Sequence, residues 1–436
     1  MVDVRGHGTS GVGPSADTVD LRVALRRMSS SGGPLVLPAG RTFVIDGPLQ
    51  VPDGTVIRGE GASSKVVFTP ASPGALFNLD SVSDVHFEDF QIVSSSPNAT
   101  EAFVFANATS CSISRVKVRG DGGGFPTAAV RITNHGGPNC YSILLQMDIG
   151  SCVGDGIRIE GPTSNAGIVI APGSQVGQCG GYGINTGVDG LAHEVHALGA
   201  VIQGSLAGQI SGSFYNGVVM GCHLENSTAS RGAPLQIGAG QVFRSLQVVG
   251  CLIANGANQQ ADAGAHGLDI QPGFESTGLT VEGCTFTAAT HAAAKVDRVI
   301  GFRFANNTIH ADLAPLDLGE SVSGIALELS RAGEFGVRAT VPIRTVRADH
   351  VATLYDEIIL VDVDAPVTVT LPPASSLNGG GQTYVVKNTG NQGQGTSIVT
   401  SAGESIEGEP SLVLQGKWKG VTLVSDGSRW VIVSRL

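Results

Sequence analysis

The sequence predicts a right-handed parallel β-helix, an all-β solenoid in which successive turns of the chain stack on one another. The main observation is a recurring pair of apolar residues separated by one residue, the alternation of a β-strand. Up to Ile184 the pairs recur every 26 or 27 residues, and the next step of 51 residues spans two turns, with Gly208/Ile210 between them. A fixed period of this length indicates one solenoid turn. The pairs are Phe77/Leu79, Phe103/Phe105, Val130/Ile132, Ile157/Ile159, Ile184/Thr186, Leu235/Ile237 and Leu268/Ile270.

A second position also recurs once per turn, and it holds Cys222, Cys251, Cys284 and Asn307. We expect these cysteines to stack inside the solenoid as small apolar thiols. The seven cysteines include no C-x-x-C motif, so we expect neither a disulfide nor a metal site. The composition agrees with a solenoid, because 62 glycines can serve its corners and only 14% of the residues are charged.

The two ends of the chain differ from the repeats. Residues 14–33 predict a helix, with Leu21, Leu25 and Met28 on one face and Ser15 or Asp17 as the cap. Such a helix would cover the open end of the solenoid. We expect an N-terminal cap at 1–60, the parallel β-helix at 61–312, a transition at 313–350 and a small antiparallel β-domain at 351–436.

Composition and charge exclude several classes of partner. The net charge of −11 argues against nucleic acid, since binding phosphates needs clustered lysine and arginine. No run of about 18 apolar residues predicts a membrane span. The first residues lack the apolar core of a signal peptide, so we expect synthesis in a bacterial cytoplasm without classical secretion. No motif calls for a cofactor.

One outward residue lies between the two members of each apolar pair. These residues are Asn78, Val104, Arg131, Arg158, Asn185, Gln209, Gln236 and Asp269, and Glu101, Asp155, Tyr182 and His266 lie beside them. Planar amides and guanidiniums repeated at about 4.8 Å suit a row of sugar residues. We take Arg131, Arg158, Asn185, Gln236, Asp269 and His266 as candidate binding residues. An ordinary polar solvent face is the alternative.

For catalysis, a hydrolase needs two carboxylates about 5–9.5 Å apart. Asp155 and Asp269 are four turns apart, about 19 Å, and Asp155 and Glu160 are about 16 Å apart along one strand. A lyase needs a base facing a sugar carboxylate. Arg158 with Tyr182 on the next turn, oriented by Asp155, is the available set, and a structural ion pair is its alternative.

Two tryptophans and a pair of histidines are further candidates for a binding or metal site. Trp418 and Trp430 lie in the C-terminal domain and are candidate receptor residues, with core packing as the alternative. Because aromatic residues make up only 5% of the sequence, we expect no exposed aromatic platform on the solenoid itself, which counts against a processive enzyme. In His193-Glu-Val-His196 the two histidines should point to opposite faces of a strand, which disfavours zinc.

The opening of the chain resembles a known family. The segments are Asp3-Val-Arg-Gly-His-Gly8, the helix from Asp17 to Leu25, Gly32-Gly-Pro-Leu-Val-Leu-Pro-Ala-Gly40 and Ile57-Arg-Gly-Glu-Gly61. They resemble the start of the pectate-lyase-like β-helix family of phage tailspikes, and the resemblance runs to about residue 312. Thr368-Val-Thr-Leu-Pro-Pro373 and the segment from Gly420 to Trp430 resemble C-terminal modules of phage fibres and spikes.

This resemblance implies a homotrimeric spike or fibre on a phage or a phage-like particle of the gene transfer agent type, attached at head or tail. It would bind a host surface polysaccharide for adsorption. Because the chain opens with the β-helix, we expect a base or adaptor protein to hold the particle end near Met1 to Thr9. The alternatives are a polysaccharide depolymerase, working on the β-helix face or between subunits, and a structural decoration protein that binds no sugar.

Overall fold

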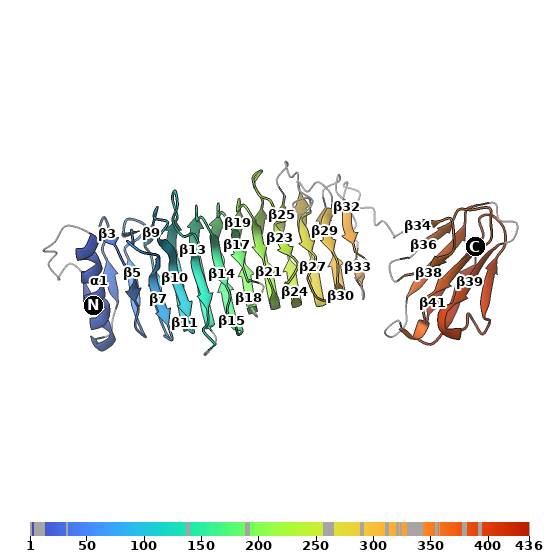
Figure 1. Ribbon diagram of the computed structural model, residues 1–436, viewed down its shortest axis with the longest axis horizontal. Helices are drawn as coiled ribbons and strands as arrows, with labels where there is room; N and C mark the ends of the chain where they lie inside the picture. The colour runs from blue at the N-terminus through green and yellow to red at the C-terminus, as the bar shows by residue number, and fades with distance from the viewer. Residues whose placement is uncertain are drawn as a thin grey trace. The chain divides into compact units, whose positions relative to one another are not determined.

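The computed structural model (Figure 1) describes residues 2–3, 14–31, 34–136, 140–187, 192–255, 266–287, 292–309, 314–319, 322, 325–328, 343–353, 356, 358–376, 382–390 and 395–435. Its contacts divide the chain into two compact units, residues 1–337 and 338–436. No helix in the described part of the chain is long and apolar enough to cross a membrane.

The first unit is a parallel β-helix, as the period predicts. Each full coil passes through three columns of strands, and every pairing in the columns is parallel. The right hand of the coil stays an expectation from the general preference of parallel crossovers. The first column is an 11-stranded sheet made of β4 (Leu49–Gln50), β7 (Gly74–Asp80), β10 (Ala99–Ala106), β12 (Ala128–Thr133), β14 (Asp155–Ile159), β17 (Tyr182–Asn185), β20 (Gly208–Ser211), β23 (Leu235–Ile237), β26 (Leu268–Ile270), β29 (Ala292–Val296) and β32 (Ala314–Leu318).

The other two columns join into one 22-stranded sheet, because β11 and β13 run through both. The second column holds β1 (Val2–Asp3), β2 (Leu35–Leu37), β5 (Val56–Gly59), β8 (His86–Glu88), β11 (Thr109–Arg119), β13 (Tyr141–Gly150), β15 (Asn165–Ile170), β18 (Ala192–Leu198), β21 (Phe214–Met220), β24 (Phe243–Val249), β27 (Ser276–Glu282), β30 (Val299–Ala305) and β33 (Ala326–Glu328). The third adds β3 (Thr42–Ile45), β6 (Lys65–Phe68), β9 (Gln91–Val93), β16 (Gln175–Gly177), β19 (Val201–Gln203), β22 (His223–Glu225), β25 (Leu252–Ala254), β28 (Thr285–Thr287) and β31 (Thr308–Ile309). Coil pairing therefore continues past residue 312.

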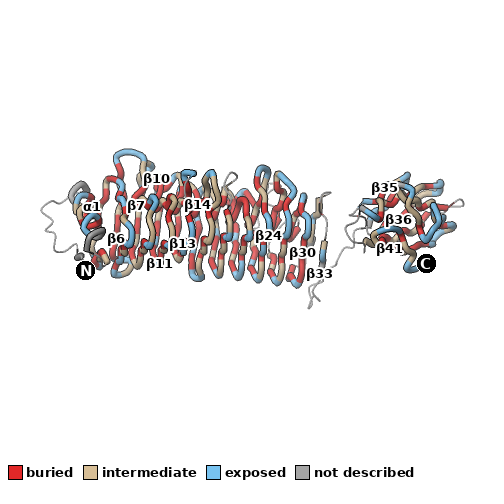
Figure 2. The backbone as a smooth tube through the Cα atoms, turned by 90° about the horizontal axis from the view of Figure 1, so that it is seen from below, coloured by how far each residue is buried: buried red, intermediate tan, exposed pale blue. Residues whose placement is uncertain are grey.

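The apolar pairs face the interior in register. Phe77 pairs with Phe103, Phe103 with Val130, and Val130 with Ile157, and all four side chains are buried. Figure 2 shows this buried interior running through the stack. The pair expected at Gly208/Ile210 is displaced by two residues, because Ile184 pairs with Ile210 rather than with Gly208.

The cysteine position is an interior ladder, as expected. Cys222, Cys251 and Cys284 are buried free thiols. Each follows a glycine in the left-handed conformation, which turns the chain from the second column into the third. The backbone N–H of Cys284 donates to Asn307 Oδ1 (2.9 Å), and Asn307 Nδ2 donates to the Val281 carbonyl (3.0 Å).

Helix α1 (Pro14–Ser31) covers the first coils (Figure 1) and contacts β2, β3 and β4. Leu21 and Leu25 are buried against them, which confirms the expected cap. Asp17 serves the coil rather than the helix end, since its Oδ2 accepts from Val44 N–H (2.9 Å). The side chains of Ser15 and Met28 lie outside those that the structure describes.

The second unit is mixed rather than antiparallel, so that part of the expectation is wrong. One sheet holds β34 (Ile343–Val346), β36 (Ile358–Val361), β38 (Thr383–Asn388), β41 (Gly420–Ser425) and β42 (Trp430–Arg435), and the other holds β35 (His350–Val351), β37 (Val367–Leu371), β39 (Thr396–Thr400) and β40 (Ser411–Leu414). The short helices η3 (Ala374–Ser376) and η4 (Ser401–Gly403) complete the unit. The first three strands of each sheet pair in parallel, and only the later ones are antiparallel. From β34 to β39 successive strands alternate between the sheets, and strand spacing alone cannot reveal that.

Candidate functional site

The outward residues of the first column form one continuous row, as the period predicts. In register, the row runs Gln50, Asn78, Val104, Arg131, Arg158, Asn185, Ser211, Gln236, Asp269, Lys295 and Asp317. The one wrong member of the expected row is Gln209. Its side chain is fully buried and donates to Asn226, and Ser211 takes its place, because the register shifts by two at β20.

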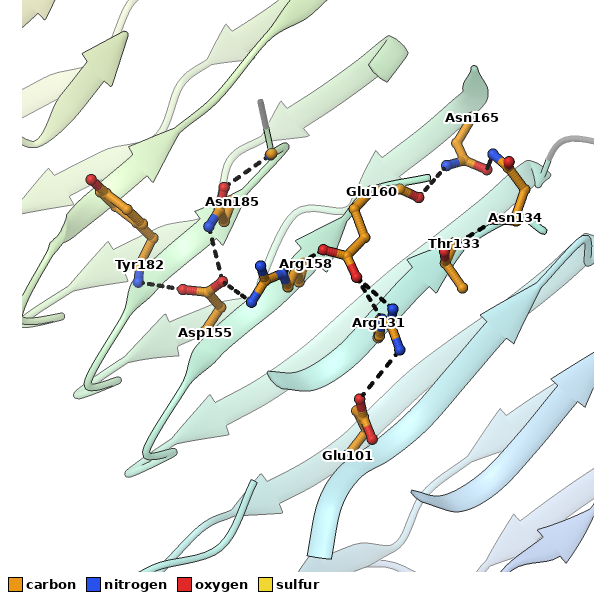
Figure 3. Close-up of polar contacts among 11 residues, drawn as sticks. Glu101, Arg131, Thr133, Asn134, Asp155, Arg158, Glu160, Asn165, Tyr182 and Asn185 are labelled. Atoms are coloured by element: carbon orange, nitrogen blue, oxygen red, sulfur yellow. Dashed lines mark hydrogen bonds and ion pairs between the residues drawn. The ribbon is translucent and has the colours of Figure 1, made fainter. Parts of the chain in front are cut away.

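Polar side chains of the middle of this row join into one network, shown in Figure 3. We call Glu101, Arg131, Asp155, Arg158, Glu160 and Asn185 the arginine cluster. Both guanidiniums bind the same carboxylate, with Arg131 Nη2 2.6 Å from Glu160 Oε1 and Arg158 Nε 2.7 Å from Glu160 Oε2. Their other ends approach Glu101 and Asp155, at 3.8 Å each. The arginine side chains are still 34% and 38% exposed, so they can also reach a ligand.

Asp155 is held by the following coil. Its Oδ1 accepts from the Tyr182 N–H (2.8 Å), and its Oδ2 accepts from Asn185 Nδ2 (3.0 Å). A Cβ on Gly181 would lie 2.1 Å from Asp155 Oδ1, so only glycine leaves room for this carboxylate. The Asp155 carboxylate is thus held in place by residues of the next coil, and the strand pattern of the sequence does not reveal this role.

The two carboxylates that flank Arg158 have opposite electrostatic surroundings. Burial raises the pKa of Asp155, against the hydrogen bonds from Tyr182 and Asn185. Burial also acts to raise the pKa of Glu160, but the two arginines outweigh it and lower that pKa below its ordinary value. A pair of carboxyl groups whose pKa values are pushed apart is the arrangement that acid–base chemistry requires.

The expected separation of Asp155 and Glu160 needs correction. Their backbone positions lie far apart along the strand, but both side chains turn toward Arg158 (Figure 3). Because Nε and Nη1 of one guanidinium are about 2.3 Å apart, the nearest oxygens of the two carboxylates are at most about 9 Å apart, below the upper limit of the separation found in glycosidases. Tyr182 joins the cluster only through its backbone N–H, and Figure 3 shows its ring directed away from Arg158.

The remaining candidates of the row are distributed unevenly. Gln236 is half-buried in the row, with a register partner in Ser211. Asp269 and His266 are only 4% and 5% exposed, and Asp269 Oδ1 accepts from Gln271 Nε2 (2.6 Å). Of the six binding candidates, the structure therefore brings together Arg131, Arg158 and Asn185. It buries Asp269 and His266.

The second column carries an aromatic ladder that the sequence analysis missed. Tyr141, Ala166, His193, Tyr215 and Arg244 follow one another in register. The His193 and Tyr215 rings stack with centroids 4.8 Å apart, Arg244 lies over the other side of Tyr215, and Tyr141 is 53% exposed. The solenoid thus does present aromatic surface. In three coils a ring precedes a residue in the left-handed conformation, but these residues are Ser142, Glu194 and Asn216, so no common residue type marks the kink in the sequence.

That kink also corrects the expectation for the two histidines. Glu194 has φ 51°, so His193 and His196 both lie on the outer side while Val195 between them is buried. Among the described residues, no three histidine, cysteine or acidic side chains gather closely enough to hold a metal ion.

The two tryptophans have different places. Trp430 is fully buried, its Nε1 donates to the Pro372 carbonyl (3.1 Å), and its ring packs against Tyr384. It belongs to the core and offers no face to a receptor. Trp418 is 59% exposed.

Solved structures match the chain through its architecture. The crystal structure of the Dettilon tailspike protein has a TM-score of 0.53 at 15% sequence identity, over 74% of this chain and 70% of that one. The chain shares the parallel β-helix fold of phage tailspikes. A mutant tailspike protein of the E. coli bacteriophage HK620, in complex with a pentasaccharide, has a TM-score of 0.51 at 12% identity, over 88% and 77%.

An adhesin has the same architecture. PfbA, a surface adhesin of Streptococcus pneumoniae, has a TM-score of 0.52 at 9% identity, over 99% of this chain and 98% of that one. No protein-family model and no curated protein sequence matches the chain. At these identities the comparisons establish the fold and leave the function to the site itself.

Proposed function

We propose that this protein is a spike or fibre of a phage or phage-like particle that binds a polysaccharide on the host surface. The observation that carries the proposal is the arginine cluster. Arg131, Arg158 and Asn185 lie on adjacent in-register strands and present planar hydrogen-bonding groups at steps of about 4.8 Å. Guanidinium and amide groups match the hydroxyls and carboxylates of a sugar chain.

Further support comes from the fold. Tailspikes share it, and one of them is in complex with a pentasaccharide. The proposal includes a homotrimer, attachment at head or tail, a particle of the gene transfer agent type, and an adaptor protein near the N-terminus. These parts rest on the resemblance of the opening and C-terminal segments to spike proteins.

The test is retention of purified host capsule on immobilised protein, with reducing ends and unsaturated sugar products followed in the same sample. Arg131→Gln/Arg158→Gln should weaken retention about tenfold or more, since hydrogen bonds to charged groups contribute about 1.5–3 kcal/mol each. Arg58→Gln/Arg115→Gln is the matched control, because it also removes two guanidiniums, which form exposed ion pairs with Glu88 (2.6 Å) and Asp89 (2.7 Å) away from the first column. No retention by the wild-type protein would favour a decoration protein that binds no sugar.

A second candidate function is polysaccharide hydrolysis at the same cluster. It is favoured by the raised pKa of Asp155, a general acid, and the lowered pKa of Glu160, a base, on two sides of Arg158. Release of reducing ends that Asp155→Asn and Glu160→Gln each abolish would establish it. Retention without release would leave the binding proposal alone.

A further inference from the structure

The C-terminal unit carries an exposed tryptophan flanked by lysines. Trp418 is 59% exposed, and the Nζ atoms of Lys387 and Lys417 lie 5.8 and 5.4 Å from the centroid of its ring. Lys419 follows Trp418 and is also exposed. The whole sequence has only six lysines and a net charge of −11. Two of the six lysines therefore lie beside one indole ring, and a third is the next residue in the chain.

The backbone around this ring is held in place. Trp418 N–H donates to the Asn388 carbonyl (2.9 Å), and Asn388 N–H donates to the Lys419 carbonyl (2.8 Å). The fully buried Asn388 side chain also donates to the Leu414 carbonyl (2.8 Å). Lys387 precedes Asn388 on β38, so the same bonds hold the backbone at both Trp418 and Lys387.

Trp418 adopts a conformation that a bulky residue rarely takes. Its φ is 68°, in the left-handed region, where a side chain with a Cβ is strained. The bonds from Asn388 stabilise this conformation, and the result is an exposed ring rather than a buried one. An exposed ring on a strained backbone contributes little to the core, and its face is open to a ligand.

The lysine charges are available to a ligand. The ion pairs described in this unit join Arg344 and Asp356, His350 and Asp356, Arg347 and Asp362, and Arg429 and Asp426. None of those described pairs includes Lys387, Lys417 or Lys419. Contact with the indole face holds an ammonium group nearby without neutralising it.

We propose that Trp418, Lys387 and Lys417 form a binding site for a carboxylated sugar residue, with the sugar ring on the indole and its carboxylate between the ammonium groups. This inference rests on the proposed polysaccharide binding and names the class of sugar. Indole faces bury sugar C–H groups well, and charge-assisted hydrogen bonds favour an anion. The acidic chain as a whole disfavours an extended polyanion such as nucleic acid.

The experiment uses the fluorescence of the full chain, in which Trp418 and Trp430 are the only tryptophans and Trp430 is buried. The probes are tetragalacturonate and its neutral counterpart, galactotetraose. We expect saturable quenching by the acidic tetramer alone, weakened by about 0.5 M salt. Lys387→Gln/Lys417→Gln should raise the half-saturating concentration at least tenfold, and Lys417→Gln alone should raise it less.

Lys65→Gln/Lys117→Gln removes the same charge from the β-helix and should leave the quenching unchanged. Equal quenching by both tetramers, or no effect of the Lys387 and Lys417 changes, would overturn the site. The site would also be overturned if Lys387→Gln/Lys417→Gln changed the oligomeric mass of the protein and left sugar binding unchanged. That result would identify this surface as a contact between copies of the chain. If the protein retains capsule but its fluorescence does not respond to tetragalacturonate, only this inference is contradicted. If the protein does not retain capsule, the proposed function is contradicted.

Discussion

The position of the Asp155 carboxylate depends on a glycine and on a backbone N–H group, and on no functional side chain of either residue. Gly181 leaves the space that this carboxylate occupies, and the Tyr182 N–H binds it there. At the scale of single residues, the geometry of the candidate site therefore depends on the space that a glycine leaves and on backbone N–H donors. The sequence pattern identified Asp155, Arg158 and Arg131 as neighbours, but it could not place Glu160, because side-chain direction and length decide that contact.

We predict that Gly181→Ala displaces Asp155 and destabilises the β-helix by about 1–3 kcal/mol, as overpacking does. The added methyl group would lie 2.1 Å from Asp155 Oδ1. The free energy of unfolding in urea measures the effect. Gly74→Ala is the control, because the nearest atom to its added methyl group is 4.0 Å away. Equal stability of the two variants would contradict the packing described here.

We predict that Asp155 and Glu160 give opposite pH dependence. The raised pKa of Asp155 means that the native state holds this proton more tightly than the unfolded chain. Its contribution to the free energy of unfolding is therefore complete below the ordinary aspartate pKa and is lost as the pH rises through the native value. The lowered pKa of Glu160 gives a contribution that is present above the ordinary glutamate pKa and is lost as the pH falls through the native value.

Urea unfolding of the wild-type protein, Asp155→Asn and Glu160→Gln over a range of pH tests the direction of each pH dependence. As the pH falls from 7 to about 4, the wild-type protein should gain stability relative to Asp155→Asn. Below about pH 4.3 it should lose stability relative to Glu160→Gln. Parallel curves for the wild-type protein and both variants would show that neither pKa is shifted.

At the scale of the element, the interior ladder of cysteines and asparagine that links successive coils is the feature that the sequence predicts best. Cys251, Cys284 and Asn307 recur at one place because each follows the same left-handed corner. The period also gave the inward pairs and most of the outward row. It failed at β20, where Gly208 offers no apolar side chain to fix the register, and in the C-terminal unit, where alternation cannot distinguish parallel from antiparallel pairing.

We predict that Asn307→Ala costs about 1–3 kcal/mol, because it leaves the buried N–H of Cys284 and the Val281 carbonyl without their partner. Thr308→Ala, an exposed position on the same coil, should have an effect within about 0.5 kcal/mol. Thermal and urea unfolding of both variants provide the comparison. A cost at Thr308 equal to that at Asn307 would be inconsistent with the ladder.

At the scale of the whole molecule, the proposed homotrimer is the next property to measure. Exposed Tyr141, Met220 and Phe274 on the first unit, at 53%, 46% and 68%, are apolar surface that association could cover. We predict that light scattering coupled to gel filtration gives three times the 44.4 kDa chain mass. A single chain mass across the accessible concentration range would exclude the trimer and leave the single-chain sites intact.

The parallel stacking of the first unit has a mechanical consequence. Hydrogen bonds between strands run from coil to coil, so a pull on the two ends of the stack loads every interface in series. Each interface then carries the full force, and the one with the fewest bonds ruptures first. In the first column three interfaces pair at only two residues each, namely β4 with β7, β14 with β17 and β20 with β23. Under tension this column would therefore part first at one of these three interfaces, and the interface between β14 and β17 is the one that joins Arg158 to Asn185 in the arginine cluster.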